Sequence, residues 1–214
     1  TNIITTSAEI ADLLADTYSM ISNDSNYDAT FLKNRNTTNL DTNPPFDDYI
    51  VNYNEKLTME ELIDMLNQCK SKGTGPDNIP YELLKQLPPE ALNYLNEVFN
   101  YIWINKVFPT QWHQAIVVPI PKPNKDRSLP QNYRSISLTC TMCKLMEKVV
   151  NQRLRWTLET QNFFTSTQSA FRRCHSTYDT LITLEYEILQ AFSSSQHISL
   201  VSLDIEKAHD MTNR

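Results

Sequence analysis

The side chains best suited to chemistry lie in residues 203–210, whose sequence is LDIEKAHD. Asp204 follows residues 198–203, an apolar run of the kind that forms a buried strand. A carboxylate held at the end of such a strand can bind a hard cation such as Mg²⁺, which bridges phosphate oxygens. Taken alone, an Asp in this position is more often a helix cap, so the rest of the chain must decide between the two interpretations.

The charge distribution indicates where a polyanion could bind. Residues 106–175 carry eleven Lys and Arg against three Asp and Glu, a net charge of +8, whereas residues 1–105 carry −10 and residues 176–214 carry −4. Binding of basic side chains to a polyanion is favourable because it releases the counterions condensed on that polyanion. Solvated helix faces are the alternative explanation, and clustering of charge alone favours that explanation.

Length and composition predict a globular chain. The 214 residues are 40% hydrophobic and can bury a substantial core. Four cysteines in so long a chain predict no disulfide framework, so a reducing compartment is the default. No apolar run approaches the ~18 residues of a spanning helix and no basic-then-apolar leader opens the chain, so we expect neither a membrane nor a secreted protein. We also expect a piece of something longer, because the sequence stops inside an expected helix.

Apolar spacing and capping signals predict six helices ahead of the one expected after residue 205. They are expected at residues 7–21, 58 to about 70, 81–86, 89 to about 105, 141–159 and 176 to about 192. Both glycines of the chain, Gly73 and Gly75, fall in the turn 73–80, where the backbone needs a tight bend or a close approach. The side chains expected to face the core are Leu62, Met65, Leu66, Cys69, Leu92, Leu95, Val98, Phe99, Ile102, Leu145, Met146, Val149 and Leu154.

Three strands and one long polar segment complete the expected organisation. Residues 115–120 and 134–138 predict a β-hairpin with a basic tip, and Pro119 and Pro121 place its first strand towards a sheet edge. Residues 198–203 predict a buried strand. Residues 22–56 are rich in Asn, Asp and Thr, which predicts a linker or an extended arm.

Five sequence blocks, in this order, resemble the reverse transcriptases of non-LTR (LINE-type, jockey-like) retrotransposons. They are residues 75–84 (GPDNIPYELL), 118–122 (VPIPK), 132–138 (NYRSISL) with 144–148 (KLMEK), 168–172 (QSAFR) with the Ser-Thr pair at 176–177, and 203–210. The order and the gaps together are far more specific than any single block.

The resemblance covers roughly residues 58–214 and implies a fold and a function. The expected fold is mixed α/β and helix-rich, comprising the fingers and the first palm strand of a right-hand polymerase, truncated at its C-terminal end. Residues 1–57 would be an N-terminal helix and a polar linker ahead of the polymerase. The implied function is RNA-directed DNA polymerisation by two-Mg²⁺ nucleotidyl transfer, with an RNA template, a DNA primer and dNTPs as partners. An intracellular location, with a nuclear step, is implied by the resemblance alone.

The resemblance also implies roles for individual residues. Asp204 matches the first catalytic aspartate, which holds Mg²⁺ together with the carbonyl of Ile205. Lys122 and Arg134 match basic fingers residues that bind the incoming triphosphate. The guanidinium of Arg can donate hydrogen bonds to two phosphate oxygens at once, whereas the ammonium of Lys acts as a point charge. Arg172, Arg173 and Ser176 match a segment that lies against template and primer, where a helix N-terminus favours anions.

The sequence departs from the family pattern at several positions. Ser135 replaces the usual Pro, while Ala170 and Cys174 replace Gly. His209 stands in the nucleotide-binding position that normally carries Phe or Tyr, which puts discrimination against a 2′-hydroxyl in doubt. The second metal-binding block, an aromatic-x-Asp-Asp turn, is absent from this sequence, so we expect the isolated chain to bind nucleic acid weakly and not to polymerise.

Other functions compete with this interpretation. A non-catalytic nucleic-acid-binding or interaction module derived from polymerase fingers is the main alternative. Cys140 and Cys143 invite a zinc or redox interpretation, but they are more simply small core residues. No Gly-x-Ser-x-Gly motif supports a serine hydrolase. The aromatic side chains among the arginines could stack on bases, but most of them are expected in the core: Tyr133, Phe163, Phe164, Phe171 and Tyr178.

Overall fold

The computed structural model describes residues 6–21, 23–37, 54–70 and 73–205. The described residues divide into two compact units, one that ends at Glu147 and one that begins at Lys148. The first unit contains α1 (Ser7–Ile21), α2 (Ala29–Thr37), α3 (Met59–Gln68), α4 (Tyr81–Lys85), α5 (Pro89–Asn105), β1 (Ala115–Pro121) and β2 (Tyr133–Thr139). Helix α6 (Thr141–Thr160) starts in the first unit and continues into the second, which also contains α7 (Thr177–Ser193).

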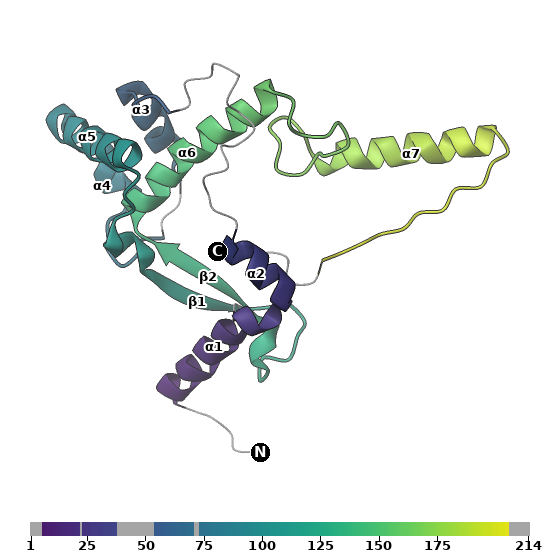
Figure 1. The fold of residues 1–214 in the computed structure, drawn as a ribbon, viewed down its shortest axis with the longest axis horizontal. Helices are drawn as coiled ribbons and strands as arrows, with labels where there is room; N and C mark the ends of the chain where they lie inside the picture. The colour runs from purple at the N-terminus through teal and green to yellow at the C-terminus, as the bar shows by residue number, and fades with distance from the viewer. Residues whose placement is uncertain (1–5, 22, 38–53, 71–72, 206–214) are drawn as a thin grey trace. The chain divides into compact units, whose positions relative to one another are not determined.

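The core of the first unit lies around α3, α4 and α5, which are grouped together in Figure 1. Spacing of three and four residues gives each helix one buried stripe. The buried side chains are Leu57, Leu62, Met65, Leu66, Cys69, Tyr81, Leu84, Leu95, Phe99, Ile102 and Trp112, with Cys140, Cys143, Leu145 and Met146 at the start of α6. Val98, expected in this core, is 51% exposed.

Local signals explain where the helices begin. The Thr58 side chain accepts a hydrogen bond from the Glu61 N–H, and the Glu61 carboxylate accepts one from the Thr58 N–H, so the predicted capping box opens α3. Pro89 occupies the first position of α5, where its missing N–H costs nothing. Lys106 ends α5 in the left-handed conformation. These helix boundaries confirm the sequence prediction.

Strands β1 and β2 form the predicted antiparallel hairpin (Figure 1). Ala115 pairs with Thr139 at one end, and Pro121 pairs with Tyr133 at the other. Among the described residues this hairpin is the only sheet, so both strands are edges, which suits the two prolines of β1. The face that carries Ile116, Val118 and Ile136 is partly exposed.

Besides Val98, three sequence predictions differ from the structure. Residues 29–37 form α2 within the segment expected to be a linker. Residues 198–203 form no strand, and Leu200, Val201 and Leu203 are 71–90% exposed. A strand needs a hydrogen-bonding partner, and the described strands pair only with each other. Leu154 is 51% exposed rather than inward. The helix expected after residue 205 lies outside the described residues.

The architecture is therefore mixed and helix-rich, with one small two-stranded sheet. No helix in the described ranges combines the length and the apolarity needed to cross a membrane.

Candidate nucleotide and nucleic-acid site

The β1–β2 hairpin brings Lys122 and Arg134 to the same end of the sheet. Arg134 lies opposite Ile120, and the Lys122 N–H donates to the Asn132 carbonyl at 2.8 Å, which continues the ladder by one pair. Directly opposed residues of a hairpin lie on the same face of the sheet, and so do residues two positions apart in one strand. Arg134 is opposite Ile120 and Lys122 is two positions after it, so both basic residues lie on the face of Ile120. The structure therefore places at one end of the hairpin the two residues for which the family resemblance implies one ligand.

Hydrogen bonds within the connecting loop fix the shape of this end. The Lys122 ammonium donates to the Gln131 carbonyl at 2.9 Å, which leaves two of its three donors for other acceptors. The Asp126 carboxylate accepts from the backbone N–H and the hydroxyl of Ser128, and these bonds lower the pKa of Asp126. The Tyr133 hydroxyl donates to the Arg127 carbonyl at 2.9 Å. Arg134 is exposed, so its guanidinium is accessible to a ligand.

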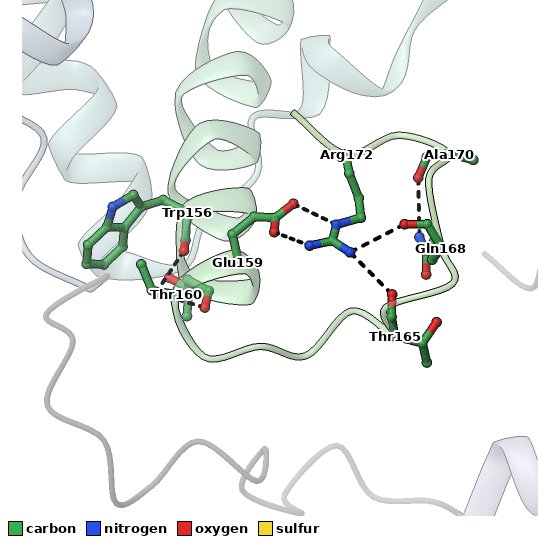
Figure 2. Close-up of polar contacts among 8 residues, drawn as sticks. Trp156, Glu159, Thr160, Thr165, Gln168, Ala170 and Arg172 are labelled. Atoms are coloured by element: carbon green, nitrogen blue, oxygen red, sulfur yellow. Dashed lines mark hydrogen bonds and ion pairs between the residues drawn. The ribbon is translucent and has the colours of Figure 1, made fainter. Parts of the chain in front are cut away.

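Arg172 lies at the centre of a hydrogen-bonded loop in the second unit, drawn in Figure 2. Its Nε donates to Oε1 of Glu159 at 3.1 Å, and its Nη2 donates to Oε2 at 2.7 Å. Its Nη1 donates to the carbonyls of Thr165 and Gln168, and its Cζ lies 5.2 Å from the Phe164 ring centroid. Four of its five N–H donors are therefore engaged within the unit. The sequence assigned Arg172 to nucleic acid and did not identify Glu159 as its partner.

Arg173 and Ser176 occupy different surroundings. Arg173 is exposed and can reach a phosphate from solvent. Ser176 caps α7, with its hydroxyl accepting from the Tyr178 N–H, and the Asp179 carboxylate accepts from the Ser176 N–H. That hydrogen bond lowers the pKa of Asp179. Because this carboxylate already sits at the helix N-terminus, the N-terminus is less favourable for an external anion.

Asp204 lies in the segment that follows α7, and both Asp204 and Ile205 are exposed. Among the described residues, no three His, Cys, Asp or Glu side chains gather closely enough to hold a metal ion. The described residues alone therefore do not make a magnesium site, and Asp204 offers a single carboxylate. His209 lies outside the described residues.

Cys140 and Cys143 are core residues, as predicted. Both are buried, and burial raises the pKa of each thiol, that of Cys143 to about 12 with a further contribution from Glu147. A thiol that resists deprotonation is a poor nucleophile.

The aromatic side chains among the arginines are less buried than predicted. Phe163, Phe171 and Tyr178 are 47%, 78% and 72% exposed, so the expectation that most would be core is wrong for these three. Their exposure follows from the surface loop and the unpacked helix that carry them, since none of the residues of α7 is buried.

Comparisons with known proteins agree with the predicted family. Residues 120–213 match the family model described as reverse transcriptase (RNA-dependent DNA polymerase). A probable RNA-directed DNA polymerase from transposon BS of Drosophila melanogaster is 33% identical over 155 residues, which is 72% of this chain and 17% of that protein. One from transposon X-element of the same organism is 34% identical over 146 residues, 68% of this chain and 16% of that protein. The polymerase of mobile element jockey, also from Drosophila melanogaster, is 27% identical over 155 residues, 72% and 17% of the two chains.

The chain thus contains part of a reverse transcriptase domain, in residues 120–213. Within that class it belongs to the reverse transcriptases of non-LTR retrotransposons, as the order of its sequence blocks indicated. It spans only about 17% of the length of the curated relatives it matches.

Proposed function

We propose that this chain supplies the triphosphate-binding hairpin and part of the template-primer surface of an RNA-directed DNA polymerase. The observation that carries the proposal is the position of Lys122 and Arg134 on one face at one end of the β1–β2 hairpin. A rigid, forked guanidinium beside a compact ammonium fits a triphosphate, because the fork can bind two oxygens of one phosphate while the ammonium neutralises another.

Family membership supports the remaining assignments in the parent polymerase. Asp204 is proposed as the first catalytic carboxylate, with the Ile205 carbonyl beside it and His209 under the sugar of the incoming nucleotide. When bound, Mg²⁺ would stabilise the attacking and leaving oxygens in nucleotidyl transfer. Since the described residues offer one carboxylate there, the other metal ligands must come from elsewhere in the polymerase, and we expect no polymerisation by residues 1–214 alone.

The template-primer surface is assigned chiefly to Arg173. Arg172 orders the loop that precedes it, and Ser176 starts the helix that follows, so both define where Arg173 lies. The bound partners would be an RNA template and a DNA primer. Phosphate contacts of this kind position a nucleic acid without reading its sequence, so binding should depend strongly on salt.

The experiment separates nucleotide binding from nucleic-acid binding in the 214-residue chain. Binding of dTTP with Mg²⁺ is followed by NMR of the hairpin residues, and binding of a poly(rA)–oligo(dT) hybrid by fluorescence anisotropy at several salt concentrations. We expect Arg134→Ala to weaken dTTP binding roughly tenfold with little change in hybrid affinity. Arg155→Ala, an exposed arginine on α6, is the matched control and should leave dTTP binding unchanged.

Two outcomes would overturn the proposal. An equal loss of dTTP and hybrid affinity in Arg134→Ala would remove that residue from triphosphate binding. Salt-dependent hybrid binding without any dTTP response at the hairpin would instead indicate a binding module derived from a polymerase. Extension of the oligo(dT) primer by the purified chain would overturn the expectation that the chain alone is inactive.

A further inference from the structure

The turn 73–80, which contains both glycines of the chain, is attached to the junction between β2 and α6. Asp77 makes the central contact: its Oδ2 accepts from the Thr141 backbone N–H at 2.8 Å and from the Cys140 Sγ at 2.9 Å. Thr141 is the first residue of α6, so its N–H has no partner within the helix. Asp77 therefore caps a helix from which it is separated by 64 residues in the sequence.

Two further contacts hold the turn against the same junction. The Lys144 ammonium, one turn into α6, donates to the Gly73 carbonyl at 2.8 Å. Gly75 lies so close to the end of β2 that a Cβ atom there would be 2.2 Å from the Thr139 carbonyl oxygen. A close approach of two backbones needs a residue without a side chain. The turn thus meets the last residue of β2 and the first residues of α6 together.

The junction determines the position of the hairpin. Thr139 ends the strand that carries Arg134, and the β1–β2 register then fixes Lys122. The turn itself leads directly into α4, whose Tyr81 and Leu84 are buried in the core of the first unit. A connection that runs from the α4 core through Asp77 to β2 therefore ties the hairpin to the helices.

We propose that Asp77 is a positioning residue for nucleotide binding: it anchors the β1–β2 hairpin to the α3–α5 core and so holds Lys122 and Arg134 where a triphosphate can bind both. This inference rests on the proposed function for its nucleotide role, but the anchoring itself does not. The carboxylate form suits the role, because hydrogen bonds from Cys140, Thr141 and Ile79 outweigh burial and lower the pKa of Asp77.

The first test measures anchoring by amide hydrogen exchange in the 214-residue chain. In Asp77→Ala, exchange at the first turn of α6 and along β1 and β2 should rise about tenfold or more, because a helix start and a buried thiol lose a charged partner. Asp179→Ala is the matched control, since Asp179 is also a carboxylate at a helix start but belongs to the capping box of α7 in the second unit. It should raise exchange in α7 only.

The second test asks whether anchoring matters for the ligand. Asp77→Ala should weaken dTTP binding about tenfold while hybrid affinity, assigned to Arg173, changes little; Asp179→Ala should leave dTTP binding unchanged. Asp77→Asn keeps an acceptor oxygen for the Thr141 N–H and should restore much of both the exchange protection and the dTTP affinity. Because Asp77→Asn loses the negative charge, its exchange at the first turn of α6 should still exceed that of wild type, and this difference is the readout if Asp77→Ala fails to fold.

The outcomes separate the inference from the proposed function. Unchanged exchange in β1 and β2 of both Asp77 variants would overturn the anchoring role. Faster hairpin exchange without any loss of dTTP affinity would overturn the positioning role. A wild-type chain whose hairpin does not respond to dTTP would overturn the proposed function and, with it, the nucleotide role of Asp77, whereas the exchange result would still decide whether Asp77 anchors the hairpin.

Discussion

Arg172 and Glu159 are joined by two parallel hydrogen bonds, which fasten the loop after α6 back onto α6 itself. The two bonds measure 3.1 Å and 2.7 Å, and they use the forked geometry that makes an arginine–carboxylate pair specific as well as strong (Figure 2). The same guanidinium donates to two carbonyls of that loop. Arg172 is thus engaged within the unit, whereas its neighbour Arg173 is exposed.

Substitution of the two arginines should therefore give opposite results. Arg172→Ala should increase hydrogen exchange throughout residues 161–176, because the loop loses its only described charge-paired connection to α6. Arg173→Ala should leave that exchange unchanged but weaken hybrid binding and reduce the slope of log affinity against log salt by about 1. Arg172→Lys, which keeps the charge and loses the fork, should lie between wild type and Arg172→Ala in exchange. Exchange that rises more in Arg173→Ala than in Arg172→Ala would contradict the assignment.

The Glu159 carboxylate should make the loop sensitive to acid. The hydrogen bond from Arg172 holds the pKa of Glu159 below its ordinary value of 4.5. A depressed pKa in the folded state stabilises the fold fully above the unfolded value, and that contribution is lost as the pH falls through the folded pKa. The protection factors of residues 161–176, which correct exchange rates for their intrinsic pH dependence, should therefore fall below about pH 4.5.

Glu159→Gln is the control for this pH dependence, because glutamine has the same shape and does not titrate. The other carboxylates titrate in both proteins. The difference in log protection factor of residues 161–176 between wild type and Glu159→Gln therefore isolates the Glu159 contribution. That difference should be constant above pH 5 and shrink as the pH is lowered towards 3. A difference that grows on acidification would contradict the direction of the pKa shift.

The sequence predicted well those features that depend on a few neighbouring residues. A capping box is complete within four positions, so Thr58 and Ser176 correctly marked the starts of α3 and α7. The hairpin followed from two alternating segments separated by a polar loop. The position of Lys122 and Arg134 at the same end of the sheet follows from that register, and only the family resemblance gave the two residues a common ligand.

The features that the sequence did not predict depend on partners far along the chain. Asp77 and Thr141 are 64 residues apart, and nothing in either segment names the other. Glu159 and Arg172 are closer, but a loop conformation rather than a helical repeat brings them together. Residues 198–203 have the composition of a strand and no described partner, so composition alone was misleading there.

Gly75→Ala should destabilise the first unit. The added Cβ would lie 2.2 Å from the Thr139 carbonyl oxygen, and backbone atoms cannot rotate away as a side chain can. Relief requires the turn to separate from the end of β2, at a cost of about 1–3 kcal/mol in the free energy of unfolding. Urea denaturation measures the change, with the neighbouring Thr74→Ala expected within about 0.5 kcal/mol of wild type. An unchanged midpoint for Gly75→Ala would show that the turn does not lie against Thr139.

Asn100 should be among the most sensitive polar positions of the first unit, although it lies in the middle of α5. Its Oδ1 accepts from the Leu57 N–H at 2.6 Å, and its Nδ2 donates to the Leu57 carbonyl at 3.0 Å. Leu57 is 3% exposed, so water cannot easily replace this amide. Asn100→Leu leaves the Leu57 N–H without this acceptor and removes one of two donors to the Leu57 carbonyl, so it should cost about 1–3 kcal/mol in urea denaturation.

Two further variants distinguish this double hydrogen bond from simple packing. Asn100→Asp keeps the acceptor for the Leu57 N–H but loses the donor and sets a negative charge near the Leu57 carbonyl, so it should also destabilise, increasingly as the pH rises above the carboxyl pKa. The Asn96 Nδ2 also donates to the Leu57 carbonyl, at 3.3 Å. Asn96→Ala should lower the free energy of unfolding less than Asn100→Leu, because Asn100 still donates to that oxygen. If Asn96→Ala proved the more damaging change, the Leu57 carbonyl would depend on Asn96 and the role given to Asn100 would be wrong.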